Sequence, residues 1–159
     1  MAVVTVLSCN NLDVRIAGIR VVDGLNLDIR PGEFWGLLGP NGIGKTTLLM
    51  CLAGLSEPAS GAVKLESRDI GELPRKMLAR HVGMLQQHTV YVFDSSVIQT
   101  ALTGRHPHLG YWERESAEDH ITAHDALDAV DLSRFANRSV TGLSGGEARR
   151  LSFAALLVQ

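Results

Sequence analysis

Residues 39–46 have the types and the spacing of a loop that binds phosphate. Their sequence, Gly-Pro-Asn-Gly-Ile-Gly-Lys-Thr, fits the pattern G-x-x-x-x-G-K-[ST]. The glycines lack Cβ, so the loop can curl and aim its N–H groups at an anion. Lys45 would reach the outer phosphates of a nucleotide, and the Thr46 hydroxyl would bind Mg²⁺. The predicted nucleotide-binding residues are Gly39, Pro40, Asn41, Gly42, Ile43, Gly44, Lys45, Thr46 and Thr47.

The flanks of this loop supply the context that the pattern requires. Residues 34–38 form a short apolar run that is typical of a buried strand, and Trp35 within it is expected in the core. Residues 45–55 carry apolar side chains at helical spacing. A helix that starts at the loop points its positive end at the bound anion. A glycine-rich turn with a chance lysine is the alternative, and strand–loop–helix order argues against it.

Composition limits the class of protein. With 159 residues and a hydrophobic share of 45%, one compact domain is expected. A formal net charge of −2 gives no electrostatic footprint for nucleic acid, so no such partner is expected. Two cysteines are too few for a disulfide framework. No apolar run approaches the ~20 residues of a membrane helix, and no signal peptide is expected.

The elements before residue 91 are predicted to be mostly strands. Short strands are expected at 3–7 and 12–16, broken at 8–11, with a half-exposed strand at 25–29 and a turn at Pro31-Gly32. A strand at 62–66 and a helix from Pro74 to about Arg80 follow. A buried strand at 82–85 would then deliver Gln86, Gln87 and His88 to a strand end, where α/β proteins usually place ligands.

The remainder is predicted to be helical. Ser95 or Ser96 could cap a helix that ends near Thr103, and residues 105–112 are irregular and aromatic. A helix over 117–130 is expected after the capping pair Ser116 and Asp119. Its predicted apolar face consists of Ala117, Ile121, His124, Leu127 and Val130.

The last motif is Leu143-Ser144-Gly145-Gly146-Glu147, which opens a helix from about Glu147 to Val158. Ser144 and Glu147 form a capping box, which explains both residues without any function. The two glycines cost about 1 kcal/mol each against alanine in a first turn. They are explained if another surface, or a phosphate, approaches the backbone.

The order of these motifs resembles the ATP-binding cassette (ABC) ATPases, the motor subunits of ABC transporters. The resemblance implies an α/β fold, a P-loop NTPase of ABC type with an N-terminal antiparallel β subdomain and a RecA-like core. It implies one partial cassette over residues 1–159, divided into a strand-rich part (1–33), a P-loop core (34–90), a helical insert (91–142) and a signature helix (143–159).

The resemblance also implies a role for each motif. Residues 39–46 match the Walker A loop, and Gln87 matches the glutamine that contacts Mg²⁺ and the attacking water. Lys45 and Gln87 are thus the expected catalytic residues, with ATP and Mg²⁺ as cofactors and Thr46 and Gln87 as Mg²⁺ ligands. Residues 143–147 match the signature motif, which acts in trans on the nucleotide of a second ATPase subunit in a head-to-tail dimer.

Two departures from the family pattern stand out. The position where the family stacks adenine on an aromatic side chain holds Ile16, so weak discrimination between ATP and GTP is expected. The Walker B strand, with its Mg²⁺-binding aspartate and general-base glutamate, is not present in these residues. The chain is therefore expected to be a piece of a longer ATPase, incomplete before Walker B, with an exposed apolar sheet edge.

The segment Gly104-Arg105-His106-Pro107-His108, followed by Trp112, resembles importers of iron–siderophore complexes, haem or vitamin B12. This implies ATP-driven uptake of such a compound. The expected partners are transmembrane permease subunits and, indirectly, a substrate-binding protein, with the ATPase peripheral on the cytoplasmic face of the inner membrane.

The remaining histidines and arginines allow other interpretations. The pairs His106/His108 and His120/His124 invite a zinc site, but no nearby cysteine or carboxylate motif completes one. His88 could line a permease-facing cleft, although solvent exposure is favoured, and Arg149-Arg150 fits a solvated helix face better than nucleic-acid contact. A non-transport ABC-type ATPase, and a fragment that binds nucleotide without turnover, remain the alternative functions.

Overall fold

The structure is a computed structural model that describes residues 5–87, 91 and 93–159. The chain divides into two compact units, Met1–Leu78 and Ala79–Gln159, each with its own interior. We describe each unit by itself. His88, one of the residues singled out in the sequence, lies outside the described residues, as do the first two residues of the strand predicted at 3–7.

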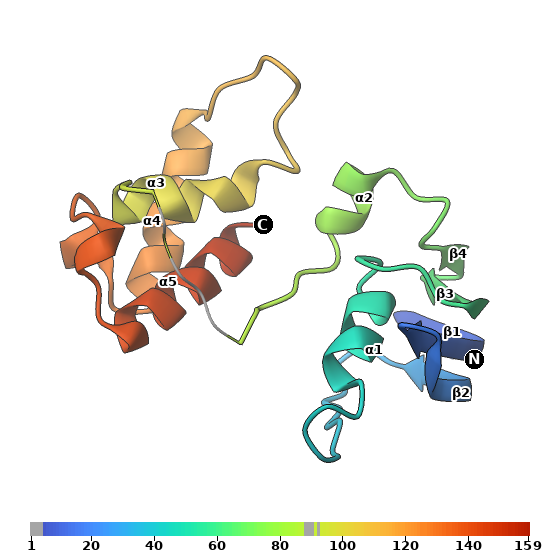
Figure 1. Cartoon of the computed structure of the whole chain (residues 1–159). Helices are drawn as coiled ribbons and strands as arrows, with labels where there is room; N and C mark the ends of the chain where they lie inside the picture. Colours follow the sequence, from blue (N-terminus) through green and yellow to red (C-terminus); the bar gives the residue numbers. More distant parts are fainter. Residues whose placement is uncertain (1–4, 88–90, 92) are drawn as a thin grey trace. The chain divides into compact units, whose positions relative to one another are not determined.

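The first unit is built on a four-stranded antiparallel sheet with the strand order β2-β1-β3-β4 (Figure 1). Its strands are β1 (Leu7–Ile16), β2 (Ile19–Ile29), β3 (Ser60–Leu65) and β4 (Arg68–Asp69). Ala17 and Gly18 join β1 to β2 with φ angles of 48° and 83°. Two successive residues with positive φ give the hairpin turn whose twist matches that of the strands. The expected N-terminal antiparallel part is confirmed.

The break predicted at residues 8–11 is wrong, because β1 runs through them. The register shifts between Asn10 and Asp13, and Asn11 has a φ of 47°. This bulge absorbs the polar Asn10-Asn11 pair without ending the strand. Gly61 on β3 permits the close approach, since a Cβ there would lie 2.3 Å from the Asn11 carbonyl oxygen.

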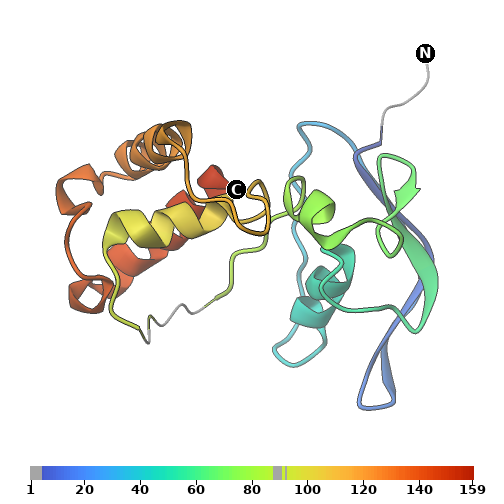
Figure 2. The ribbon, with the colours of Figure 1, turned by 90° about the horizontal axis from the view of Figure 1, so that it is seen from above.

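Helix α1 (Lys45–Leu52) follows the glycine-rich loop and lies against one face of the sheet (Figure 2). It buries Leu48, Cys51 and Leu52, while Leu49 and Leu55 are exposed. The helix ends before the predicted Leu55 because Gly54 adopts a φ of +69°, which turns the chain out of the helix. The short helix α2 (Arg75–Ala79) begins after Pro74, as predicted.

The buried strand predicted at residues 34–38 is not formed. Residues 33–40 have no regular structure, and Phe34 and Leu38 are 102% and 92% exposed. Trp35, expected in the core, is 59% exposed and donates from its indole Nε1 to Glu33 at 3.0 Å. A strand needs a neighbour to pair its backbone groups. No described strand pairs with this segment, so apolar composition alone does not make one.

The second unit is a helical bundle. Its helices are α3 (Val97–Leu102), η1 (Thr103–Arg105), α4 (Ala117–Ala129), η2 (Ser133–Phe135), η3 (Val140–Gly142) and α5 (Gly145–Val158). Helices α3, α4 and α5 pack against one another (Figure 1). Their buried side chains, such as Val97, Leu127 and Leu151, form the core of this unit. The predicted capping pair of Ser116 and Asp119 is confirmed at the start of α4. Of the two candidate caps for α3, Ser96 is the one that caps the helix, and Gln99 completes the capping box.

The predicted apolar face of α4 is wrong in part. Leu127 and Val130 are buried, but Ala117, Ile121 and His124 are exposed. Asp119, Ala123 and Ala126 are buried in their place. The buried side packs Ala123, Ala126 and Leu127 into the core, and it accommodates Asp119 because that carboxylate pairs with the Arg105 guanidinium at 2.6 Å.

The strand predicted at residues 82–85 is also absent. The segment runs beside α5 without a strand partner among the described residues (Figure 1). Side chains of α5 and its C-cap hold it instead. The Gln159 side chain donates to the carbonyls of Ala79 and Val82, the latter at 3.2 Å, and Leu156 packs against Gly83.

Candidate functional site

The loop before α1 has the backbone geometry that its glycines predict. Gly42 and Gly44 adopt φ angles of 81° and 105°, which L-residues rarely occupy. Gly44 is also the N-cap of α1, and a Cβ on it would lie 2.8 Å from Val21 Cβ on β2. Glycine at residue 44 is therefore required twice, by conformation and by packing.

Lys45 lies at the start of α1 and folds back over the loop. Its Nζ donates to the carbonyl oxygens of Gly39 and Pro40, both at 2.8 Å. An ammonium group has three donors, so these two bonds fix the position of the charge and leave a third donor. The sequence predicted this lysine, and the structure brings its charge to the first residues of the loop.

The N-terminus of α1 is well suited to an anion. No described side chain caps its first amides, and its first turn contains no acidic residue. Uncapped amides and the helix dipole make the start of a helix electropositive. The phosphate groups of a nucleotide therefore fit this loop by its donors and its charge. The Thr46 side chain, exposed beside Lys45, adds a hard oxygen of the kind that Mg²⁺ prefers.

The second unit carries the signature residues at the start of α5. Ser144 is the N-cap, and its Oγ accepts from the Glu147 N–H at 3.3 Å. The Glu147 carboxylate accepts from the Ser144 N–H and hydroxyl, both at 2.7 Å. These bonds lower the pKa of Glu147 below its ordinary value, and the bond from the Ser144 hydroxyl contributes most. A lowered pKa makes this carboxylate a weaker base, and one of its oxygens is already engaged in the cap, so the cap accounts for Glu147 without a catalytic role.

Gly145 and Gly146 lie open at the start of α5. A Cβ on either would meet no atom within 4 Å. Packing among the described residues does not require glycine here. Approach of another surface or of a phosphate stays a prediction. Leu143, the first signature residue, is half-buried against the helical core.

Gln87, predicted at a strand end, lies instead in the irregular segment beside α5, with an exposed side chain. The Arg149 guanidinium donates to the carbonyl oxygens of Gln86 and Gln87, the latter at 3.2 Å. Arg149 lies on an exposed helix face, as expected, and its guanidinium makes this contact in addition. Sequence reasoning had no signal for this contact, because its partners lie more than 60 residues away along the chain.

Arg105, which the sequence placed in an irregular segment, and the preceding Gly104 have defined structural roles. Arg105 pairs with buried Asp119 and also donates from Nη1 to the Val158 carbonyl at 3.2 Å. Arg105 therefore ties the first turn of α4 to the last turn of α5. Gly104 lies directly on the α5 backbone, where a Cβ would lie 2.1 Å from the Ala155 carbonyl oxygen.

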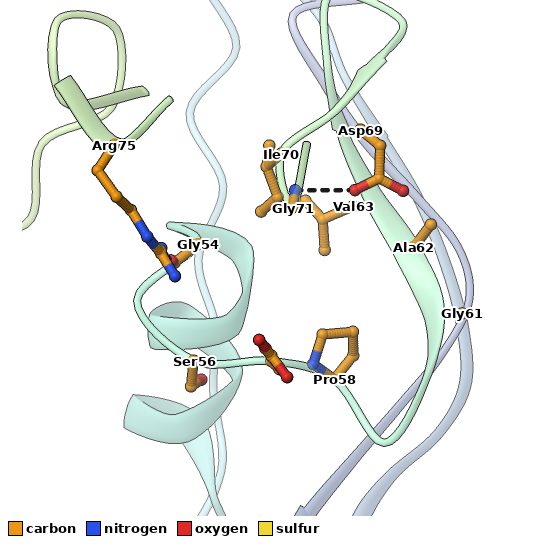
Figure 3. Close-up of a pocket in the computed structure, with 11 residues that line it drawn as sticks. Gly54, Ser56, Pro58, Gly61, Ala62, Val63, Asp69, Ile70, Gly71 and Arg75 are labelled. Atoms are coloured by element: carbon orange, nitrogen blue, oxygen red, sulfur yellow. Dashed lines mark hydrogen bonds between the residues drawn. The ribbon is translucent and has the colours of Figure 1, made fainter. Parts of the chain in front are cut away.

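A cavity of about 280 Å³ lies in the first unit, between the end of α1 and the β3–β4 region (Figure 3). Its lining includes Ser56, Asp69 and Arg75 but no residue of the loop 39–46. Asp69 accepts from the Gly71 N–H at 2.9 Å, and Arg75 donates to the Gly54 carbonyl, so both charged groups have partners. The cavity is distinct from the loop at residues 39–46.

Two absences apply to the parts of the chain that the structure describes. No three His, Cys, Asp or Glu side chains gather there in a way that could hold a metal ion. No helix in those parts is long and apolar enough to cross a bilayer.

Comparison with known proteins identifies the family. The family model described as "ABC transporter" matches residues 22–159. The hemin import ATP-binding protein HmuV of Pseudomonas aeruginosa is 42% identical over 153 residues, which are 96% of this chain and 58% of that protein. The cobalamin import ATP-binding protein BtuD of Halobacterium salinarum is 35% identical over 96% of this chain and 38% of its own length. The phosphonates import ATP-binding protein PhnC of Alcaligenes faecalis is 37% identical over 89% of this chain and 54% of its own length.

Solved structures agree on the class of fold. An inward-facing ABC transporter described as of metal-chelate type superimposes with a TM-score of 0.77 and 28% identity, over 97% of this chain and 56% of that one. An ATP-binding cassette in its ADP conformation superimposes with a TM-score of 0.79 and 22% identity, over 97% of this chain and 65% of that one, and shows the fold alone. The α/β fold is therefore that of an ABC-type P-loop cassette. The chain belongs to the ABC transporter family, and it spans little more than half the length of the hemin and phosphonate relatives.

Proposed function

We propose that the protein is the ATP-binding and ATP-hydrolysing subunit of an ABC importer. The observation that carries this proposal is the loop at residues 39–46, where the Lys45 ammonium and the uncapped first amides of α1 lie together. Positive charge and free donors at one helix start match the phosphates of a nucleotide. Family membership supports ATP as that nucleotide.

The reaction we propose is in-line attack of water on the γ-phosphate, in which positioning and charge stabilisation supply most of the catalysis. Residues 39–47 bind the phosphates through backbone N–H groups, with Lys45 on the outer oxygens. When Lys45 turns to a phosphate, it exchanges the carbonyls of Gly39 and Pro40 for a charged acceptor, which makes a stronger hydrogen bond.

A magnesium ion is the second proposed cofactor. When bound, Mg²⁺ neutralises charge on the β- and γ-phosphates. Thr46 and Gln87 would hold it, and their hydroxyl and amide oxygens are hard ligands of the type it prefers. Gln87 would also orient the attacking water. Lys45 and Gln87 are thus the proposed catalytic residues within this chain.

The signature residues act on a second subunit in this proposal. Two cassettes would pair head to tail, so that Ser144, Gly145 and Gly146 of one face the γ-phosphate held by the other. The open surface at Gly145 and Gly146 supports an approach to the backbone there. The Ser144–Glu147 cap keeps the start of α5 rigid.

Two observations support a proposal for the class of transported compound. The segment 104–108 resembles importers of iron complexes, haem or cobalamin, and relatives named for hemin and cobalamin import match most of this chain. We therefore propose uptake of a compound of that class through transmembrane permease subunits, served by a substrate-binding protein. The ATPase would be peripheral, on the cytoplasmic side of the membrane.

Replacement of Lys45 tests the nucleotide site. Lys45→Ala should weaken Mg-ATP binding at least tenfold, because it removes the side-chain cation from the loop. Titration with a fluorescent ATP analogue measures this. Lys76→Ala, which removes the same side chain from the exposed surface of α2, is the matched control and should leave binding unchanged. Equal ATP affinity in Lys45→Ala and in the unmodified protein would refute the proposed site.

A further inference from the structure

Gln87 is attached to α5 through Arg149. The Arg149 guanidinium donates from Nη1 to the carbonyl oxygens of two consecutive residues, Gln86 and Gln87. Arginine suits this task, because its planar guanidinium presents several N–H donors in a fixed geometry. The two bonds hold the backbone at the residue whose side chain is proposed to contact Mg²⁺ and water.

The chain is attached to the same part of α5 again at Tyr91. Its hydroxyl lies 3.2 Å from Ser152 Oγ and donates to the Ala148 carbonyl at 3.4 Å. Ala148, Arg149 and Ser152 span little more than one turn of α5. Residues 87 and 91 are therefore both fixed to the turn that follows the signature motif.

The preceding residues depend on α5 as well. No described strand pairs with residues 82–87, and Gly83 is so close to α5 that a Cβ there would lie 2.1 Å from Leu156 Cδ1. Gln159, at the end of α5, donates to the Val82 carbonyl at 3.2 Å. The position of Gln87 thus follows from α5, because α5 supplies the contacts along this segment.

We propose that Arg149 is a positioning residue that fixes Gln87 to the signature helix, so that Gln87 and the signature motif hold one fixed relation. This inference rests on the proposed function, since it assigns Gln87 a part in hydrolysis. Arg149 is exposed and its bonds are at the surface. We therefore expect its loss to change turnover far more than thermal stability.

The positioning role of Arg149 is tested by measuring steady-state ATP hydrolysis by the full-length protein and by four variants. The variants are Arg149→Gln, Arg149→Lys, Gln87→Ala and the double variant Arg149→Gln/Gln87→Ala. Misplacement of a catalytic group by about 1 Å can cost about 10²-fold. We expect Arg149→Gln to lower kcat about tenfold and to leave KM for Mg-ATP within about twofold of the unmodified value. The kcat of Arg149→Lys should lie between those of Arg149→Gln and the unmodified protein. The double variant should be no slower than Gln87→Ala, because residues that act as one unit are not additive. Arg114→Gln, at an exposed residue of the 110–116 loop, makes the same charge change and should leave kcat unchanged.

Hydrogen–deuterium exchange of the nucleotide-free protein gives a readout that does not depend on activity. Peptides covering residues 84–91 should exchange faster in Arg149→Gln than in Arg114→Gln, while those covering α4 should not change. Melting temperatures of both variants within about 2 °C of the unmodified protein would show that the fold is intact. If Arg149→Gln does not fold, Arg149→Lys, which keeps the charge and loses the planar group, takes its place in both assays.

Three results would overturn the inference. They are a kcat of Arg149→Gln within twofold of the unmodified value, a further fall in kcat when Arg149→Gln is added to Gln87→Ala, and unchanged exchange over 84–91. If Gln87→Ala and Lys45→Ala both retain full turnover, the proposed function fails instead, and the exchange result alone decides whether Arg149 holds the segment.

Discussion

Gly104 offers the sharpest test of the packing in the helical unit. A Cβ built on it lies 2.1 Å from the Ala155 carbonyl oxygen and 3.1 Å from Val158 Cβ. Its φ is not in the left-handed region, so the backbone itself would accept alanine. Any cost of Gly104→Ala must therefore come from the collision with α5.

The magnitude follows from the distances. Carbon–oxygen contacts of about 3.3 Å are the close limit in packed structures, so the new methyl group falls about 1.2 Å short. Backbone must move to make the room, because Ala155 presents its carbonyl rather than a flexible side chain. Leu151, Ala154 and Val158 are buried on α5, and a shift of this helix disturbs the core they join. Overpacking of this kind costs about 1–3 kcal/mol, and a backbone collision belongs at the upper end.

Thermal unfolding followed by circular dichroism measures this cost. About 3 kcal/mol corresponds to a melting temperature lowered by roughly 6–12 °C in a protein of this size. Gly146→Ala is the matched control, because it is also a helical glycine but its Cβ would meet no atom within 4 Å. It should gain about 0.4–1 kcal/mol from the lower entropy of the unfolded chain. A Gly104→Ala protein as stable as Gly146→Ala would refute the described contact between η1 and α5.

Two further predictions concern the same unit. Asp119 has its pKa lowered from 3.8 to about 2, first by the Ser116 N–H and then by the Arg105 guanidinium, so its ionised form stabilises the fold. The contribution of Asp119 to stability is complete above about pH 4 and is lost as the pH falls toward 2. The urea midpoint should therefore fall over this pH range in the unmodified protein, and Asp119→Asn should abolish the share of that fall that comes from Asp119. Leu127 is fully buried on α4, so Leu127→Ala should lower the free energy of unfolding by about 2–5 kcal/mol. Ile121→Ala, on the same helix but 61% exposed, should cost less than about 1 kcal/mol, and equal losses in a urea titration would contradict the described orientation of α4.

Local features were predictable from the sequence because they need only neighbouring residues. The caps at Ser96, Ser116 and Ser144 each join residues three apart along the chain. The turn at Gly44 needs a glycine wherever the rest of the chain lies. These predictions hold in the structure because the interactions that carry them are complete within one turn.

Apolar composition led to wrong predictions of strands, because a strand requires a neighbouring strand to pair with. Residues 34–38 and 82–85 have the character of buried strands, yet neither pairs with a described strand. A β-strand is stabilised by backbone hydrogen bonds to a neighbouring strand, which can lie anywhere in the chain. The sequence of one segment therefore gives only its β-propensity and does not determine whether a strand forms. On α4, Ile121 satisfied the helical period, but it is exposed, and the buried face instead carries Asp119, the ion-pair partner of Arg105.

The sequence by itself predicted a phosphate site in the loop at residues 39–46, determined the cap of the helix that begins after Ser144 and, through the order of these motifs, indicated the family. Their chemistry depends on residue types at fixed short spacing. Tertiary structure alone decided that Arg149 holds Gln87, that Arg105 joins the ends of α4 and α5, and that Gly104 must lack a side chain. Each of these contacts joins residues at least 14 positions apart, and only the folded chain brings such residues within hydrogen-bond or van der Waals distance.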